Sequence, residues 1–345
     1  MHIKIHTYNF TSNYGAVLQA FSLGYYLNSL IKSEVTFSSF HPYKLKYYEF
    51  IRPLLSKKPN KVFGHFKKNI EILNWRRFYL KELSQNKDFS AKDINFSIYG
   101  SDEIWNFLNP YYGFSDFFFG GKAVGKKIAY AASIGKATYN DLTQENKRKI
   151  TYLLNDYNSI SVRDDNTADF VNKLTGRLPE IVVDPTLLSN HIFFNSSNKI
   201  NSDKKFAVIY GLNFTDEEIK KIKDFCNKKK LEIISLGYFN SWVSNNKLGL
   251  NPSDFYEYIK KSSCVFTSMF HGIILSIKSN KNFWYTVDPI RIFKVKYIIS
   301  KFHLENRNLS NIKNLEGDID YKELNKILEP WINKSREFLS NSIKQ

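Results

Sequence analysis

One histidine of this chain stands where a side chain can bind an anion and exchange a proton. His271 lies in the polar run 267–272, between the apolar stretches 264–266 and 273–277. That order predicts a buried strand, a tight turn and the start of a helix. A helix N-terminus gathers unpaired N–H groups and attracts anions, and an imidazole titrates near neutral pH. His271 is therefore a candidate phosphate- or carboxylate-binding group and general acid, with a capping or packing role as the alternative.

Four further polar residues each follow a predicted strand: Asn13, Asp102, Arg163 and Asp184. Polar residues at the carboxyl ends of parallel strands lie at the edge where open α/β sheets bind ligands. Arg163 could bind an anion there, and the two carboxylates could accept a proton. For Asn13 and Asp184 we favour a role in turns. Asp102 could instead cap a helix beginning at Glu103, and Arg163 could form a surface ion pair.

The elements around these residues alternate between strand and helix, which is typical of doubly wound α/β layers. Expected strands are 3–8, 94–99, 127–133, 159–162, 181–183, 206–210, 231–236 and 264–266. Expected helices begin after 13, cover 145–156, 215–228 and 253–261, and begin again at His271, with Thr215 and Ser253 as caps. Residues 189–205 are rich in Asn, Ser and Lys and are the expected linker. The sequence thus predicts two Rossmann-like doubly wound domains, 1–188 and 204–345, that face each other across a cleft.

Length and composition agree with this class of protein. A chain of 345 residues exceeds what one hydrophobic core usually organises. The two cysteines, Cys226 and Cys264, form neither a disulfide framework nor a zinc motif, and the seven histidines are scattered. NTPase, dinucleotide-binding and α/β-hydrolase motifs are absent. With no apparent signal peptide and no long apolar run, we expect a cytoplasmic protein without a metal site.

The positive charge is concentrated in one region. The formal net charge is +17, and residues 43–87 contain nine Lys and three Arg against three Glu, interleaved with aromatic side chains. Such a region suits an anionic membrane surface or an acidic polymer. Nucleic acid is the weakest candidate, because no nucleic-acid-binding motif is present. The alternative is a pair of surface helices with a solvated lysine face and a buried aromatic face.

Several segments, taken in order, are similar to those of a known enzyme family. They are 13–20 (NYGAVLQA), 100–106 (GSDEIWN), 130–133 (YAAS) with Gly135, 161–164 (SVRD), 184–188 (DPTLL), 270–272 (FHG), and 291–292 (RI) with 304–307 (LENR). With these segments the chain resembles the polysaccharide pyruvyl transferase family. Each segment alone is weak, but their common order is specific.

The resemblance implies a GT-B-like arrangement of the two domains, with the first on the acceptor side and the second, which includes the C-terminal helices, on the donor side. It implies phosphoenolpyruvate as donor, with no cofactor, and transfer of a pyruvyl group as a cyclic ketal to a sugar. The catalytic residues it implies are His271 and Asp102. The implied donor-binding residues are Arg163, Ser268, His271, Gly272 and Arg291, and the implied acceptor-binding residues are Asn13, Tyr14, Asp102 and Trp105. We expect His271 and Arg163 to lie together between the domains.

The acceptor implied by the resemblance is a glycan linked to polyprenyl diphosphate or to a nucleotide, at the inner face of the cytoplasmic membrane. Two departures from the family pattern bear on the donor. Met269 stands where many members carry Arg, and Glu103 stands where Gln is more common. Losing a guanidinium removes a bidentate partner for phosphate. The alternatives are a GT-B glycosyltransferase that uses a nucleotide sugar and a non-catalytic relative that binds acidic glycans.

Overall fold

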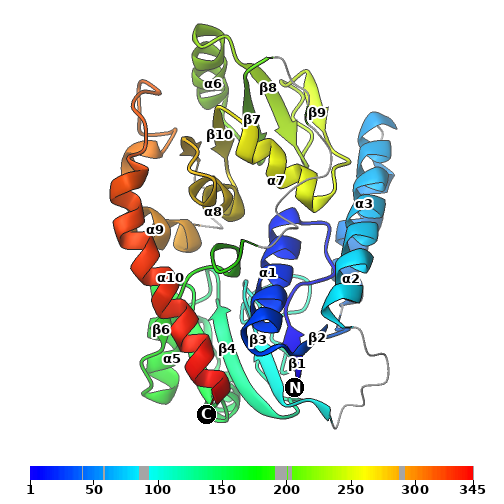
Figure 1. The fold of residues 1–345 in the computed structure, drawn as a ribbon, viewed down its shortest axis with the longest axis vertical. Helices are drawn as coiled ribbons and strands as arrows, with labels where there is room; N and C mark the ends of the chain where they lie inside the picture. The colour runs from blue at the N-terminus through cyan, green and yellow to red at the C-terminus, as the bar shows by residue number, and fades with distance from the viewer. Residues whose placement is uncertain are drawn as a thin grey trace.

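The computed structural model describes residues 1–40, 42–56, 59–84, 93–190, 200, 204–286 and 292–344, and it contains two parallel sheets (Figure 1). The first has the strand order β2-β1-β3-β4-β5-β6, and the second has the order β11-β10-β7-β8-β9. The strands of the first sheet are β1 (His2–His6), β2 (Glu34–Phe37), β3 (Phe96–Tyr99), β4 (Lys126–Ala132), β5 (Ser159–Val162) and β6 (Glu180–Ile181). Those of the second are β7 (Phe206–Tyr210), β8 (Glu232–Leu236), β9 (Asn245–Lys247), β10 (Cys264–Thr267) and β11 (Phe283–Tyr285).

The helices connect these strands and cover the sheets. The α-helices are α1 (Tyr14–Ile31), α2 (Tyr43–Lys46), α3 (Pro59–Leu83), α4 (Gln144–Asn155), α5 (Asp165–Thr175), α6 (Asp216–Lys228), α7 (Pro252–Lys261), α8 (Phe270–Lys278), α9 (Ile292–Lys301) and α10 (Tyr321–Lys344). Shorter helical segments are η1 (Tyr47–Ile51), η2 (Arg52–Leu55), η4 (Tyr139–Asp141), η5 (Pro185–Leu187) and η7 (Glu305–Arg307). None of the described helices has the length and apolar character needed to cross a lipid bilayer.

In each sheet the order of the strands reverses between two neighbouring strands, which creates a switch point. In the first sheet the order reverses between β1 and β3, and in the second it reverses between β7 and β10. Ligands of doubly wound sheets bind at such switch points, because the connecting helices there lie on opposite faces and leave a crevice. The segments after β1 and β3 carry Asn13 and Asp102, and the segment after β10 carries His271.

The predicted architecture of two doubly wound domains is confirmed. Strands β5 and β7 have the predicted bounds, and Thr215 caps α6 with Glu218 in a capping box. The predicted cap of α7 is wrong: Asn251 caps this helix, and its side chain accepts from the Asp254 N–H. Pro252 has no N–H to be satisfied and suits the first helical position, so the helix begins one residue earlier than expected. The expected linker, 189–205, lies largely outside the described residues.

The two domains share one apolar core. A single cluster of buried side chains runs from Ile5 in β1 through Phe255 in α7 to Leu339 in α10. Helix α10 follows the second sheet in sequence but packs on the first domain, and Figure 1 shows it running along one side of both. Its Trp331 Nε1 donates to the Ile181 carbonyl over 2.8 Å, and its Ser335 Oγ accepts from the Val183 N–H over 3.0 Å. This returning helix completes the GT-B-like arrangement.

Helices α1 and α3 of the first domain reach the second domain directly. The Tyr14 hydroxyl donates to the Leu250 carbonyl over 2.8 Å and accepts from the Leu250 N–H over 3.2 Å, and its ring stacks on Phe255 at 4.4 Å. Trp75 Nε1 in α3 donates to Ser253 Oγ over 2.7 Å. These polar contacts are buried, so they fix how the domains meet rather than merely holding them together.

We predict that Tyr14→Phe lowers the free energy of unfolding by roughly 1–3 kcal/mol, because it leaves buried carbonyl and N–H groups of the second domain without a partner. Urea unfolding followed by tryptophan fluorescence measures the change. The matched control is Tyr152→Phe, which removes the same hydroxyl from a side chain that is 77% exposed. Equal stability of the two variants would show that the Tyr14 hydroxyl does not join the domains.

Candidate functional site

His271 is the second residue of α8 and follows β10 through a tight turn, as the sequence predicts. The Thr267 hydroxyl fixes this turn, because it donates to the Tyr210 carbonyl over 2.6 Å and accepts from the Met269 N–H over 3.0 Å. Met269, the N-cap residue, makes no side-chain cap to the helix. The imidazole of His271 therefore lies beside a helix N-terminus whose partial positive charge no cap neutralises.

Arg163 lies on the other side of the domain interface, directly after β5. Its Nη1 is 3.3 Å from Asp184 Oδ2 and its Nη2 is 3.2 Å from Asp102 Oδ1. The ring of Phe270, the first residue of α8, covers the guanidinium. Cζ of Arg163 lies 4.5 Å from the centroid of this ring. With 2% of its side chain exposed, Arg163 depends on the two carboxylates to compensate the burial of its charge.

Asp184 joins the two domains through one carboxylate. Its Oδ1 accepts from the Thr186 N–H and hydroxyl, at 3.0 and 2.8 Å. Its Oδ2 faces both Arg163 Nη1 and His271 Nε2, the latter at 3.5 Å, which is an ion-pair contact rather than a full hydrogen bond. The expectation that Arg163 and His271 lie together between the domains is confirmed. Asp184 also has the turn role that we favoured, through its contacts with Thr186. The same side chain thus both forms the turn and contacts Arg163 and His271.

The protonation of this cluster follows from its partners. Burial alone would raise the pKa of the Asp184 carboxyl, but the His271 imidazole, the Arg163 guanidinium and the Thr186 N–H hold that pKa below its ordinary value. Burial likewise opposes the charge of Arg163, yet Asp102 and Asp184 outweigh it and raise the arginine pKa. Asp184 therefore stays ionised and presents a negative charge to the His271 ring.

The imidazole packs directly on Gly15 of α1. A Cβ at position 15 would lie well inside van der Waals contact with the His271 ring atoms. Asn13 caps α1 by accepting from the Gly15 and Ala16 N–H groups at 3.0 and 3.4 Å, so the turn role that we favoured for it is confirmed. The N-termini of α1 and α8 thus converge on one imidazole from opposite domains. Two converging helix N-termini favour an anion at this place.

Several residues that the resemblance marks as site residues have packing roles in this structure. Tyr14 and Trp105 are completely buried, and Trp105 Nε1 donates to the Phe118 carbonyl over 2.9 Å. Both side chains pack against the protein in this structure, and the acceptor contact that the resemblance implies for them stays a prediction. No helix follows Asp102, which corrects the capping alternative; its Oδ1 accepts from the Glu103 N–H and faces Arg163.

On the donor side, Ser268 Oγ bonds to both the N–H and the carbonyl of Leu212, at 3.0 and 2.9 Å, and so ties the turn before α8 to the segment after β7. Gly272 allows α8 to pack on the Thr267 side chain, since a Cβ there would overlap its hydroxyl. Arg291 lies outside the described residues. The donor-binding roles of Arg163, Ser268, Gly272 and Arg291, and the acceptor role of Asn13, stay predictions.

Sequence reasoning missed a buried lysine next to this site. Lys68 of α3 donates to the Gly237 carbonyl over 3.2 Å, and its Nζ lies 4.6 Å from the Tyr14 ring centroid. Burial lowers the pKa of Lys68 to about 8, and the charge of Glu49 opposes this shift. Glu49 in turn accepts from the Thr11 hydroxyl over 2.6 Å and so holds the segment after β1. No sequence pattern marks this contact, because it depends on the path of α3 across the domain interface.

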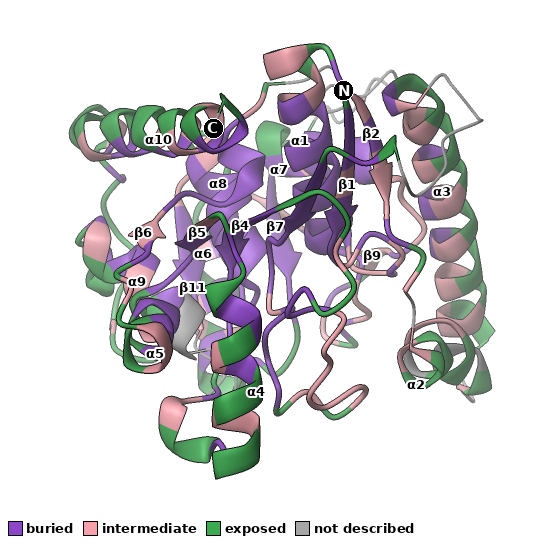
Figure 2. Cartoon of the chain, turned by 90° about the horizontal axis from the view of Figure 1, so that it is seen from below, coloured by how far each residue is buried: buried purple, intermediate pink, exposed green. Residues whose placement is uncertain are grey.

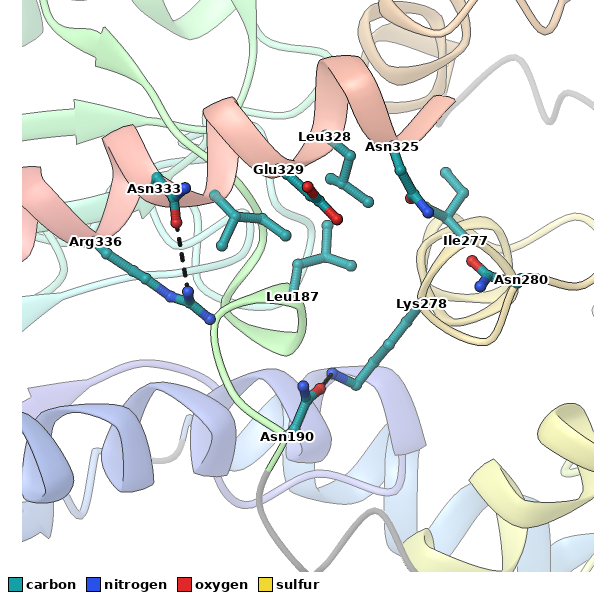
Figure 3. Close-up of a pocket in the computed structure, with 11 residues that line it drawn as sticks. Leu187, Asn190, Ile277, Lys278, Asn280, Asn325, Leu328, Glu329, Asn333 and Arg336 are labelled. Atoms are coloured by element: carbon teal, nitrogen blue, oxygen red, sulfur yellow. Dashed lines mark hydrogen bonds between the residues drawn. The ribbon is translucent and has the colours of Figure 1, made fainter. Parts of the chain in front are cut away.

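Two cavities formed by the described residues lie away from these charged groups. One, of about 420 Å³, is enclosed by α8, α10 and the segment after η5, where Lys278 Nζ donates to the Ser189 carbonyl and to Asn190 Oδ1 (Figure 3). Another, of about 630 Å³, lies at the amino ends of the second sheet, next to Trp284. Neither is lined by His271 or Arg163. The described residues also contain no cluster of three or more His, Cys, Asp or Glu side chains arranged to bind a metal ion.

The sequence profile described as polysaccharide pyruvyl transferase matches residues 13–286, a stretch that includes Asp102, Arg163, Asp184 and His271. The chain belongs to this family. It is accordingly an enzyme, a transferase that modifies polysaccharides. A comparison with curated protein sequences found no significant match.

Comparison with solved structures found similarity in fold to several enzymes. UDP-GlcNAc 2-epimerase from Neisseria meningitidis, bound to UDP-GlcNAc, has 10% identity and a TM-score of 0.45, with 99% of this chain and 97% of that chain covered. The epimerase from Methanocaldococcus jannaschii has 11% identity and a TM-score of 0.45, with 97% and 93% covered. The E. coli heptosyltransferase WaaC with ADP has 10% identity and a TM-score of 0.41, with 97% and 100% covered.

We predict that Gly15→Ala displaces the His271 imidazole and destabilises the protein, although alanine has a helix propensity about 1 kcal/mol better than glycine. Histidine-selective NMR measures the displacement and urea unfolding measures the stability. The control is Gly24→Ala in the same helix, where the added Cβ meets only side-chain ends at 3.1 Å or more. A Gly15→Ala protein with unchanged imidazole signals would contradict the interdomain contact.

A second prediction concerns how the stability that Asp184 contributes depends on pH. Because the folded-state pKa of Asp184 is depressed, its contribution to stability is present above the unfolded pKa of about 3.9 and is lost as pH falls through the folded pKa. The stability difference between the wild type and Asp184→Asn should therefore be present at neutral pH and shrink below about pH 4. Urea unfolding across this pH range measures it, with the exposed Asp169→Asn as control. A difference that grows on acidification would contradict the charge assignment.

Proposed function

We propose that this enzyme transfers a pyruvyl group from phosphoenolpyruvate to two hydroxyls of one sugar in a cell-surface polysaccharide precursor, such as that of a capsule or exopolysaccharide. The product is a cyclic ketal, and inorganic phosphate is released. The observation that carries the proposal is the Arg163–Asp184–His271 cluster, which lies at the domain interface within the stretch that matches the family.

The reaction needs one proton donor, one base and a site for anions. Protonation of C3 of the enol makes an oxocarbenium-like centre at C2, and a sugar hydroxyl attacks that centre. Loss of phosphate regenerates the cationic centre, and the second hydroxyl closes the ketal. One hydroxyl proton replaces the proton that the acid delivered to C3, and the other leaves with phosphate, so the net reaction needs no redox cofactor.

The residues of the cluster suit these steps. His271 is the proton donor, and the ionised carboxylate of Asp184 orients its ring. The converging N-termini of α1 and α8 bind the phosphate. Asp102 is the base: its side chain is 11% exposed, whereas that of Asp184 is completely buried, so Asp102 is the carboxylate that an acceptor hydroxyl reaches. Arg163 positions both carboxylates and adds a positive charge to the site.

This structure holds the site closed, with Arg163, Asp184 and His271 almost completely buried. Substrates therefore enter when the two domains move apart, and closure then removes water from the reacting groups. Met269 favours a second candidate function, because it makes the N-terminus of α8 less cationic than in many family members. That candidate is a glycosyltransferase that uses a nucleotide sugar.

Calorimetric titration of the purified protein distinguishes the two functions. We expect phosphoenolpyruvate to bind and UDP-GlcNAc not to bind. Saturable binding of UDP-GlcNAc without binding of phosphoenolpyruvate would support the glycosyltransferase instead, and binding of neither would support a non-catalytic relative.

For the transfer itself, we expect His271→Gln to lower the rate of phosphate release from phosphoenolpyruvate by about a hundredfold to ten-thousandfold, as is typical for loss of a general acid. Phosphorus NMR with a panel of lipid-linked and nucleotide-linked glycans measures the release. His303→Gln, at an exposed histidine, is the control. A folded His271→Gln enzyme with near wild-type turnover would leave His271 with a packing role only.

A further inference from the structure

The segments α2, η1, η2 and α3 expose an unusual number of large apolar side chains. Of the fourteen exposed large apolar side chains among the described residues, eight lie between positions 43 and 78. We call them the α2–α3 face; they are Tyr43, Tyr47, Ile51, Leu55, Phe63, Phe66, Ile70 and Phe78. Figure 2 shows α2 and α3 at the edge of the molecule, with exposed residues along both. Single exposed apolar residues are ordinary, but a gathered set marks an interaction site.

Helix α3 has apolar residues on two opposite faces. Ile72, Trp75 and Leu83 are buried and pack on the core. Phe63, Phe66 and Ile70 recur at the i, i+3, i+7 spacing of one helical face and are 69%, 53% and 41% exposed. The core therefore explains one face only. Among the described residues, the core does not account for the apolar side chains of the outer face.

The same surface is positively charged. Exposed cations on it are Lys44, Lys46, Arg52, Lys67, Arg77 and Lys81. Of the three glutamates between positions 43 and 84, Glu49 is bound to Thr11 and Glu71 is partly buried, while Glu82 is exposed and bonds Tyr25. Little negative charge is thus available to neutralise the exposed cations.

We propose that the α2–α3 face docks on an anionic lipid bilayer. A bilayer surface offers anionic headgroups to the Lys and Arg side chains and an apolar boundary to the aromatic and aliphatic ones. An acidic polysaccharide would engage the cations and stack on aromatic rings, but it offers no apolar medium to Ile51, Leu55 and Ile70. A merely solvated helix face would need none of these exposed apolar side chains.

Docking through this face would also orient the site. The same elements hold the segment after β1: Arg76 Nη2 donates to Asn9 Oδ1 over 2.8 Å, and the Phe50 and Phe10 rings are 5.2 Å apart. That segment ends at Asn13, beside Gly15 and His271. The bilayer would therefore lie on the side of the molecule where α3 and η1 contact the segment after β1. This orienting role of the docking rests on the proposed function, because it would bring the site to an acceptor carried on a lipid.

Sedimentation with vesicles tests the docking without any substrate. We expect the protein to bind vesicles that contain phosphatidylglycerol much more tightly than vesicles of phosphatidylcholine alone. Added salt should weaken the binding steeply, because the screening length falls from about 30 Å at 0.01 M to about 8 Å at 0.15 M.

Two sets of variants locate the surface. Reversing three charges in Lys67→Glu/Arg77→Glu/Lys81→Glu should weaken binding by about a hundredfold or more, since each well-placed cation is worth about fivefold. Its control is Lys220→Glu/Lys223→Glu/Lys228→Glu on α6, which changes the net charge equally. Phe63→Ser/Phe66→Ser should also weaken binding, whereas Tyr152→Ser/Leu178→Ser, at side chains 77% and 82% exposed, should not.

Equal losses in the α3 and α6 charge variants would overturn the proposal, because binding would then follow net charge rather than this face. Unchanged vesicle binding by the Phe63→Ser/Phe66→Ser variant, or binding to the acidic polysaccharide alginate but not to vesicles, would overturn it as well. Circular dichroism establishes that each variant is folded. Vesicle binding needs no phosphoenolpyruvate, so failure of the docking and failure of the proposed pyruvyl transfer give separate results.

Discussion

The rest of the site depends on the contacts that the buried carboxylate of Asp184 makes with Arg163 and His271. An arginine that is 2% exposed is unfavourable unless carboxylates compensate its charge, and Asp184 and Asp102 do so from two neighbouring segments. The oxygen of Asp184 that faces Arg163 also faces His271 from the other domain. A single residue thus compensates a charge in the first domain and positions the imidazole contributed by the second.

The rest of the interface maintains this geometry by several independent means. Apolar burial is continuous between the domains, and α10 returns to the first domain. Tyr14 is held by backbone groups of the second domain, and in the same helix the absence of a Cβ at Gly15 makes room for the histidine ring. Adjacent residues of α1 therefore set the spacing of the domains and the position of the imidazole. We infer that opening of the interface breaks the contacts around Tyr14 and His271 together.

The sequence predicted the parts of this structure that depend on local patterns. Apolar runs that end in polar residues located β5, β7 and β10, and Thr215 as the predicted cap located the start of α6. The position of His271 after a strand and at a helix start was also local. Its proximity to Arg163 followed from the rule that ligand sites of open α/β sheets lie outside the carboxyl ends of the strands.

What the sequence could not predict depends on contacts between distant segments. Tyr14 and Trp105 lie in family-like motifs, yet their burial is set by Leu250 and Phe118, which no local pattern connects to them. For the basic region, surface helices were one of the alternatives that the sequence left open. No local pattern indicated that α3 would carry Lys68 into the interface between the domains. The double role of Asp184 could not be predicted for the same reason. Its turn motif indicates only the local contact with Thr186.

A double-mutant cycle between Asp184 and His271 tests the central claim most directly. The free energies of unfolding of the wild type, Asp184→Asn, His271→Gln and the double variant give the coupling between the two side chains. If Asp184 joins the domains as described, the coupling is about 0.5–3 kcal/mol, the range found for residues in direct contact. Additive effects of the two substitutions, with a coupling near zero, would contradict the account.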